Sequence, residues 1–257
     1  MDWYLYPLVI AGGFMAGFIN TFAGSGSLIT LPILIFLGLP ANVANGTNRV
    51  AIIMQNVTAV GSFSQQKVLD YRRGLILAIP TVLGALVGAQ IAVSLDAETM
   101  KRVIGALMLV MLVIVLFRPR QWLEGHPGRL AARPGWTQML IFFAIGIHGG
   151  FIQAGVGIFL LAGLVLSAGY ELVRANAVKL LIVLCFTPLA LIIFLAHDQV
   201  QWYAGLILGI GNMAGAWVAS RMAVRRGAVF ARYVLIVVLV TASTVLLGLS
   251  DLVRQML

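Results

Sequence analysis

The chain has 257 residues, of which 61% are hydrophobic and only 10% are charged, and its formal net charge is +9. Soluble domains carry about a quarter charged residues and cannot bury apolar surface in this proportion. The composition therefore excludes a soluble enzyme, a disordered chain and a secreted disulfide scaffold, and it predicts an integral membrane protein. The positive charges stand in short loops between apolar segments, as membrane orientation requires, so we expect no nucleic-acid partner.

The apolar residues form ten segments, five on each side of a polar stretch. The first five cover about 5–22, 27–39, 43–65, 74–93 and 101–117, and the last five cover about 136–153, 157–170, 174–196, 203–223 and 231–250. A helix needs about 20 residues to cross a bilayer, so 27–39 and 157–170 are too short for an easy crossing. Short segments at matching places in two halves indicate the binding site of a transporter. The predicted fold is all-α, a polytopic transmembrane helical bundle with short broken or re-entrant helices.

The two halves match without a gap at an offset of 131 residues. At this offset Gly24, Gly26, Gly38, Ala44 and Asn45 fall on Gly155, Gly157, Gly169, Ala175 and Asn176. Glycine and asparagine in an ungapped register rarely coincide by chance, so we predict an internal duplication. The first repeat would cover 1–117, a basic cytoplasmic linker 118–135, and the second repeat 136–257.

The charges of the loops indicate how the two repeats are oriented. The loop at 66–73 is basic and its counterpart at 197–204 is not, whereas the loop at 94–102 is balanced and its counterpart at 221–232 holds four arginines. Basic loops mark the cytoplasmic side, so the second repeat is predicted to be inverted relative to the first. Inversion needs an odd number of crossings per repeat. Five full spans satisfy this condition, and so do three spans with a re-entrant hairpin.

All 8 acidic residues lie in loops or at the edges of segments. A carboxylate-based proton relay or an acidic sodium site would need a carboxylate at membrane depth. Metal-ligand clusters and catalytic groupings are not visible in the sequence either. We therefore predict neither an enzyme nor a cofactor or metal.

Polar and basic residues do occur at depth in both halves, namely Asn45, Thr47, Asn48 and Arg49 in the first and Asn176 and Lys179 in the second. Residues three or four apart share a helix face, so each cation is predicted to lie beside an asparagine. A buried cation without an acidic partner is costly, and an anionic ligand would complement it. Alternatively, either cation extends to the membrane interface or bonds to backbone carbonyls.

The two glycine breaks add further candidates for binding. A short helix is expected to begin at each break, and the backbone N–H groups at a helix N-terminus attract anions. The candidates are the N–H groups of Gly24, Ser25 and Gly26 in the first half and of Gly155 and Gly157 in the second. Ser25 and Ser27 add hydroxyl groups, and Asn20 and Gln153 precede the breaks. His148 is the one histidine inside an apolar segment. It is either a proton relay or a neutral contact to a backbone carbonyl.

These motifs resemble the sulfite exporter TauE/SafE family, also called the 4-toluene sulfonate uptake permease family. The resemblance covers nearly the whole chain and rests on 16–27, 31–32, 38–40, 44–48 and 149–157. The family more often has three glycines where this chain has Gly24-Ser25-Gly26. The resemblance implies transport of small sulfur-containing or organic anions across a cytoplasmic membrane, often outward.

The sequence thus predicts a secondary transporter in a bacterial-type inner membrane that exports a small anion, such as sulfite or an organosulfonate, by alternating access. Electrogenic efflux without a coupled ion is the first expectation, and proton coupling through His148 is the second. An anion channel and a non-transporting membrane scaffold are the alternatives. Whether the chain forms a homo-oligomer is left open.

Overall fold

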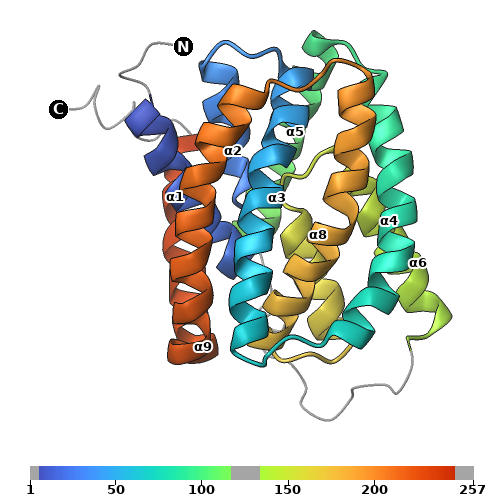
Figure 1. The fold of residues 1–257 in the computed structure, drawn as a ribbon, viewed down its shortest axis with the longest axis vertical. Helices are drawn as coiled ribbons and strands as arrows, with labels where there is room; N and C mark the ends of the chain where they lie inside the picture. The colour runs from blue at the N-terminus through green and yellow to red at the C-terminus, as the bar shows by residue number, and fades with distance from the viewer. Residues whose placement is uncertain (1–5, 117–133, 247–257) are drawn as a thin grey trace.

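The computed structural model describes residues 6–116 and 134–246, with side chains in the last helix up to Val224. Every regular element in these residues is helical, which confirms the all-α prediction (Figure 1). The elements are α1 (Tyr6–Ala23), α2 (Ser27–Phe36), α3 (Ala41–Gln65), α4 (Tyr71–Val93), α5 (Ala97–Leu116), α6 (Trp136–Phe151), α7 (Val156–Ala162), the π-helix η3 (Gly163–Ser167), α8 (Leu172–Ala196) and α9 (Trp202–Leu246). The predicted linker at 118–135 lies outside the described residues except for its last two positions.

The two segments predicted to be short are short helices. α2 has 10 residues, and α7 has 7 residues and continues into the 5-residue π-helix η3. Glycines with positive φ stand in the breaks before them, Gly24 at 76° and Gly155 at 77°. Only glycine adopts this conformation readily, so the break positions follow directly from the sequence.

One predicted boundary is wrong. The segments expected at 203–223 and 231–250 belong to a single helix, α9, as far as residue 246. The arginines between them interrupt the apolar pattern, but no proline is present there, so helical hydrogen bonding continues. The ends of an apolar run show where the chain leaves the membrane, whereas the end of a helix depends on where its backbone hydrogen bonding stops. The stretch of α9 that is apolar enough to cross a membrane is Trp202–Val224.

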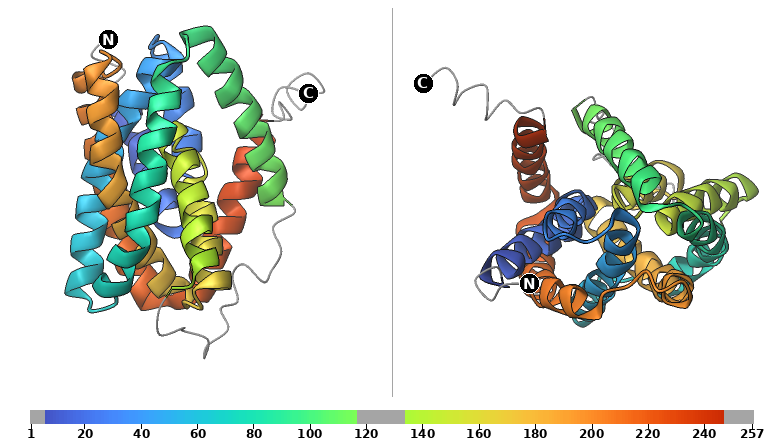
Figure 2. Two further views of the ribbon diagram at one scale, coloured as in Figure 1. Left: turned by 90° about the vertical axis from the view of Figure 1, so that its right-hand side faces the viewer. Right: turned by 90° about the horizontal axis from the view of Figure 1, so that it is seen from above.

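The short helices form two hairpins that enter the bundle from opposite ends (Figures 1 and 2). α1 and α2 have their outer ends where α3 begins, and α6 and the α7–η3 pair have theirs where α8 begins. The tips of the hairpins meet inside the bundle. A Cβ atom on Gly24 would lie 2.3 Å from the backbone of Gly157, and one on Gly157 would lie 2.3 Å from Gly24 Cα. The two breaks are therefore in direct backbone contact.

A longer helix packs along the first helix of each hairpin. α1 packs along α9, and α6 packs along α4. Glycines allow both close approaches, since a Cβ on Gly84 of α4 would lie 2.1 Å from Phe143 O, and one on Gly215 of α9 would lie 2.0 Å from Phe14 O. Small residues at four-residue spacing let membrane helices approach in this way. α3 and α8 complete the bundle, packing against each other and against α9 and α4.

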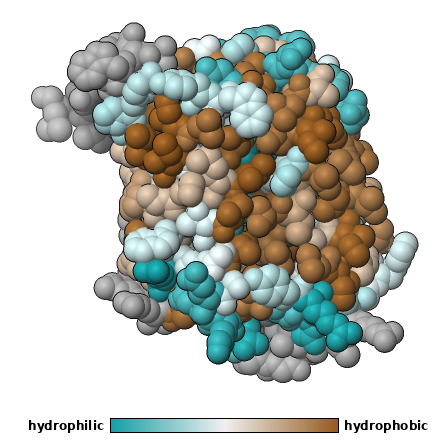
Figure 3. Space-filling view, viewed as in Figure 1, coloured by the Kyte–Doolittle hydropathy of each residue, from teal (hydrophilic) through white to brown (hydrophobic). Residues whose placement is uncertain are grey.

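The outer surface carries an apolar band between two hydrophilic ends (Figure 3). On α4 the exposed face is formed by large apolar side chains four residues apart, with Leu75, Ile79 and Leu83 exposed by 49%, 63% and 55%. Among the described residues, three helices are long and apolar enough to cross a membrane, namely α4, α8 and the first part of α9. An apolar outer face on such helices is what a lipid environment requires. The structure is consistent with a multi-pass membrane protein.

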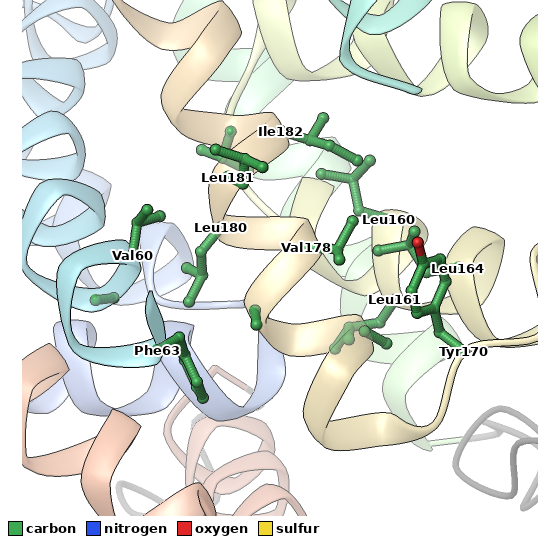
Figure 4. Packing of buried hydrophobic residues seen from close by; sticks show 14 of the residues in the cluster. Val60, Phe63, Leu160, Leu161, Leu164, Tyr170, Val178, Leu180, Leu181 and Ile182 are labelled. Atoms are coloured by element: carbon green, nitrogen blue, oxygen red, sulfur yellow. The ribbon is translucent and has the colours of Figure 1, made fainter. Parts of the chain in front are cut away.

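The main apolar core lies where α8 passes α3 and the α7–η3 pair (Figure 4). Its labelled members are Val60, Phe63, Leu160, Leu161, Leu164, Tyr170, Val178, Leu180, Leu181 and Ile182. This core fixes α8 against the second hairpin and thereby sets the position of Lys179, whose neighbours Val178 and Leu180 belong to it.

Candidate functional site

A small pocket lies beside the meeting point of the two hairpins, with a volume of about 10 Å³. This is the space that about one water molecule needs, so a larger ligand would require the surrounding helices to move apart. Its polar lining comes from both halves, with Asn20 and Ser27 from the first and Gln153 and Lys179 from the second. Gly157 and apolar side chains of α3, α7 and α8 complete the wall.

Lys179 joins the pocket to the end of α1. Its Nζ donates to Asn20 O at 2.8 Å, to Thr21 O at 3.2 Å and to Asn176 Oδ1 at 2.9 Å. Asn20 and Thr21 belong to the last turn of α1, where carbonyl oxygens carry partial negative charge, and Asn20 O also accepts from Gly24 N at 2.9 Å. Lys179 therefore caps α1, and the predicted contact between Lys179 and Asn176 is present.

Arg49 caps the end of α6 in the same way. It is completely buried, and its guanidinium donates to Gly149 O at 3.3 Å and to Gly150 O. Asn45, four residues earlier on α3, donates from Nδ2 to Phe151 O at 2.8 Å. The guanidinium also lies 4.4 Å from the ring centroid of Phe194, at a cation–π distance. Asn45 and Arg49 thus share a helix face, and both bond to the last turn of α6.

Besides an anionic ligand, the sequence left open that these cations extend to the membrane interface or bond to backbone carbonyls, and in the structure both bond to backbone carbonyls. Neither Arg49 nor Lys179 extends to a surface; each bonds to carbonyls of a broken helix in the opposite half. The helix ends therefore compensate part of each positive charge. Lys179 also lines the pocket, whereas Arg49 does not.

Thr47 and Asn48 hold neighbouring elements together rather than lining the pocket. Thr47 Oγ1 accepts from the backbone N–H of Gln201 at 2.8 Å, which ties α3 to the start of α9. Asn48 accepts from Thr30 Oγ1 at 2.6 Å and donates to Ser27 Oγ at 3.2 Å, which ties α3 to α2. The second interaction orients Ser27, and Ser27 lines the pocket.

The backbone amides after the breaks are largely used within the turns. Leu28 N donates to Ser25 O at 3.1 Å, Ile29 N donates to Gly26 O at 2.9 Å, and Ile158 N donates to Gly155 O at 2.9 Å. Helix N-termini therefore offer a ligand fewer donors than the sequence suggested. Side chains on the pocket wall are better placed for that role.

His148 lies outside the pocket lining. Its Nε2 is 3.0 Å from Ala154 O, and its ring packs edge-on against Phe159. This is the backbone-carbonyl contact that the sequence left as an alternative to a proton relay. In the described part of the chain, no three histidine, cysteine, aspartate or glutamate side chains come close enough together to hold a metal ion.

One polar residue beside the pocket carries only a weak sequence signal. Thr187 precedes Pro188, a pair that predicts a kink in α8, yet Thr187 Oγ1 accepts from Gln153 Nε2 at 2.7 Å. Thr187 thereby contacts a residue of the pocket wall.

Sequence comparisons with known proteins identify the family of this chain. The model of the family described as "Sulfite exporter TauE/SafE" matches residues 9–246. The chain belongs to the TauE/SafE family. Similar proteins include the "Probable membrane transporter protein ORF9" of Sinorhizobium sp, 26% identical over 96% of this chain and 94% of that protein. The "Probable membrane transporter protein YfcA" of Escherichia coli K12 is 26% identical over 91% of this chain and 86% of its own length.

A third relative, a "Probable membrane transporter protein" of Haemophilus influenzae, is 26% identical over 91% of both chains. No solved structure matches the chain significantly. Together the family match and these relatives identify this TauE/SafE protein as a membrane transporter.

Proposed function

We propose that this transporter exports a small anion, such as sulfite or an organosulfonate, by alternating access. The observation that carries the proposal is the pocket between the two hairpin tips, with the ammonium group of Lys179 on its wall. Lys179 is 1% exposed, and its ammonium group bonds to two backbone carbonyls of α1 and to Asn176. A small polar pocket beside a buried positive charge favours a small negative ligand.

We propose further that the two halves are inverted repeats that rock against each other. The six positive-φ residues of the described chain support this, because they pair at the offset of 131 residues. The pairs are Gly24 and Gly155 (76° and 77°), Gly38 and Gly169 (90° and 75°), and Lys67 and Asp198 (58° and 55°). Entry of the hairpins from opposite ends is a second support, since inverted repeats place broken helices in this way.

The membrane potential can drive such export without a coupled ion. Moving one charge through 100 mV is worth about 2.3 kcal/mol, which corresponds to roughly a fifty-fold gradient. In other transporters with broken helices, the C-terminal ends of half-helices hold a coupling cation. Here Arg49 and Lys179 bond to those ends, so the protein supplies cations of its own at both places.

Transport of labelled sulfite in proteoliposomes tests the proposal. We expect saturable efflux that accelerates when the interior is made negative and that does not require a pH gradient. Lys179→Met should abolish it, whereas Lys101→Met, at an exposed position on α5, should leave it unchanged. Flux without saturation or exchange would indicate a channel, and no flux of any anion would indicate a scaffold. Flux driven by a pH gradient at zero potential, and lost in His148→Asn, would support proton coupling instead.

A further inference from the structure

The amide group of Gln153 has a fixed orientation at the pocket. Thr187 Oγ1 donates its single proton to Val183 O at 2.7 Å, as threonine often does within a helix. The same oxygen can then only accept, and it accepts from Gln153 Nε2 at 2.7 Å. The nitrogen of the Gln153 amide is therefore held by Thr187, and the oxygen is directed away from it.

Gln153 Oε1 is thus a buried acceptor at the pocket. The residue is 2% exposed, and its Oε1 has no hydrogen-bond partner among the described residues. The nearby ammonium of Lys179 bonds to α1 carbonyls and to Asn176, so it contributes charge to the pocket. A buried acceptor without a donor is costly, so a ligand that brings its own donor is favoured.

Ser27 gives the pocket a hydrogen-bond donor. Its Oγ accepts from Asn48 Nδ2 at 3.2 Å, so its hydroxyl proton can be directed to an oxygen of a ligand. The pocket wall therefore combines a positive charge, one hydroxyl donor and one amide acceptor. A spherical anion with acceptor atoms alone would leave the acceptor of Gln153 unpaired.

From this arrangement, and resting on the proposed anion transport, we infer a rule of selection among anions. The pocket prefers a singly charged anion that carries a hydrogen-bond donor, such as a protonated oxyanion or a hydroxy-substituted sulfonate. An anion of equal charge and similar size without a donor binds more weakly. Gln153 is the residue that determines this specificity, and Thr187 is the residue that positions it.

Two matched pairs of ligands test the inference on purified protein in detergent micelles. Ethanesulfonate and 2-hydroxyethanesulfonate differ in a donor on the tail, and methanesulfonate and hydrogen sulfite differ in a donor on the anionic head. Isothermal titration calorimetry gives the dissociation constants. We expect the donor-bearing member of at least one pair to bind about tenfold more tightly, or better. The pair that shows this affinity difference indicates whether the anionic head or the tail of the ligand faces Gln153.

Variants separate this specificity from general binding. Gln153→Met should bring the affinity ratio of the responding pair close to one while ethanesulfonate still binds. Thr187→Val releases the amide and should also abolish the ratio, whereas Thr187→Ser keeps the hydroxyl group and should preserve it. If Gln153→Met fails to fold, the two Thr187 variants decide the question. Equal affinities within both pairs in the native protein, or an unchanged ratio in Thr187→Val, would overturn the inference. Absence of binding by all four anions would instead contradict the proposed function itself.

Discussion

Removing the guanidinium of Arg49 is predicted to destabilise the protein strongly, even though Arg49 forms no ion pair among the described residues. The last-turn carbonyls of Gly149 and Gly150 accept from it, and an unpaired buried acceptor costs about 1–3 kcal/mol. Arg49→Met would leave both carbonyls unpaired and would lose the contact with Phe194. Because a buried cation no longer has to be desolvated, part of this loss is recovered. With two carbonyls unpaired and part of the loss recovered, we expect a net loss of about 2–4 kcal/mol.

Equilibrium unfolding in mixed micelles of increasing dodecyl sulfate content, followed by far-UV circular dichroism, measures this loss. Arg49→Lys keeps the charge but cannot bond two carbonyls with a rigid fork, so its loss should be intermediate. Arg102→Met is the matched control, because its side chain is 78% exposed and its ion pair with Glu98 lies at the surface. If Arg49→Met were no more destabilising than Arg102→Met, the capping role of Arg49 would be wrong.

Further predictions concern the breaks and the loops. Gly24→Ala should prevent correct folding, because its Cβ would lie 2.3 Å from the backbone of Gly157 at a positive φ, whereas Gly61→Ala adds a methyl group in open space and should fold normally by size-exclusion chromatography. Asp96 accepts hydrogen bonds from Thr99, which lower its pKa below the ordinary value of about 3.9. Its contribution to stability is therefore complete above that value and is lost as the pH falls through the lower folded pKa. The unfolding midpoints of the native protein and Asp96→Asn should differ near neutral pH and converge in acid.

The broken helices could be predicted from the sequence because their causes are local. A ten-residue apolar run is short whatever surrounds it, and glycine permits the positive φ at Gly24 and Gly155. The continuity of α9 was not predictable from the same signals, since its arginines change the polarity of the chain but leave the helical backbone intact. At these arginines, hydropathy indicates where the helix leaves the membrane and does not indicate where the helix ends.

The site was predicted in part for a similar reason. Spacing of three or four residues correctly indicated that Arg49 lies beside Asn45 and Lys179 beside Asn176, because that relation depends on one helix alone. Their carbonyl partners lie 100 and 159 residues away along the chain, at Gly149 and Asn20. No pattern within a segment specifies such contacts, so only the fold could show that each cation caps a broken helix of the other half.

This crossed arrangement has a consequence for movement between the halves. Arg49 lies on α3 and holds the end of α6, whereas Lys179 lies on α8 and holds the end of α1. If the halves rock against each other as proposed, these helix ends must move with the cations or the bonds must break. Of these two cations, only Lys179 lines the pocket, so an anion bound there would compete with the α1 carbonyls for its ammonium. Ligand binding would then loosen the tip of the α1–α2 hairpin while Arg49 kept the α6 end fixed. Substrate binding and movement would be linked through the residue that contacts both.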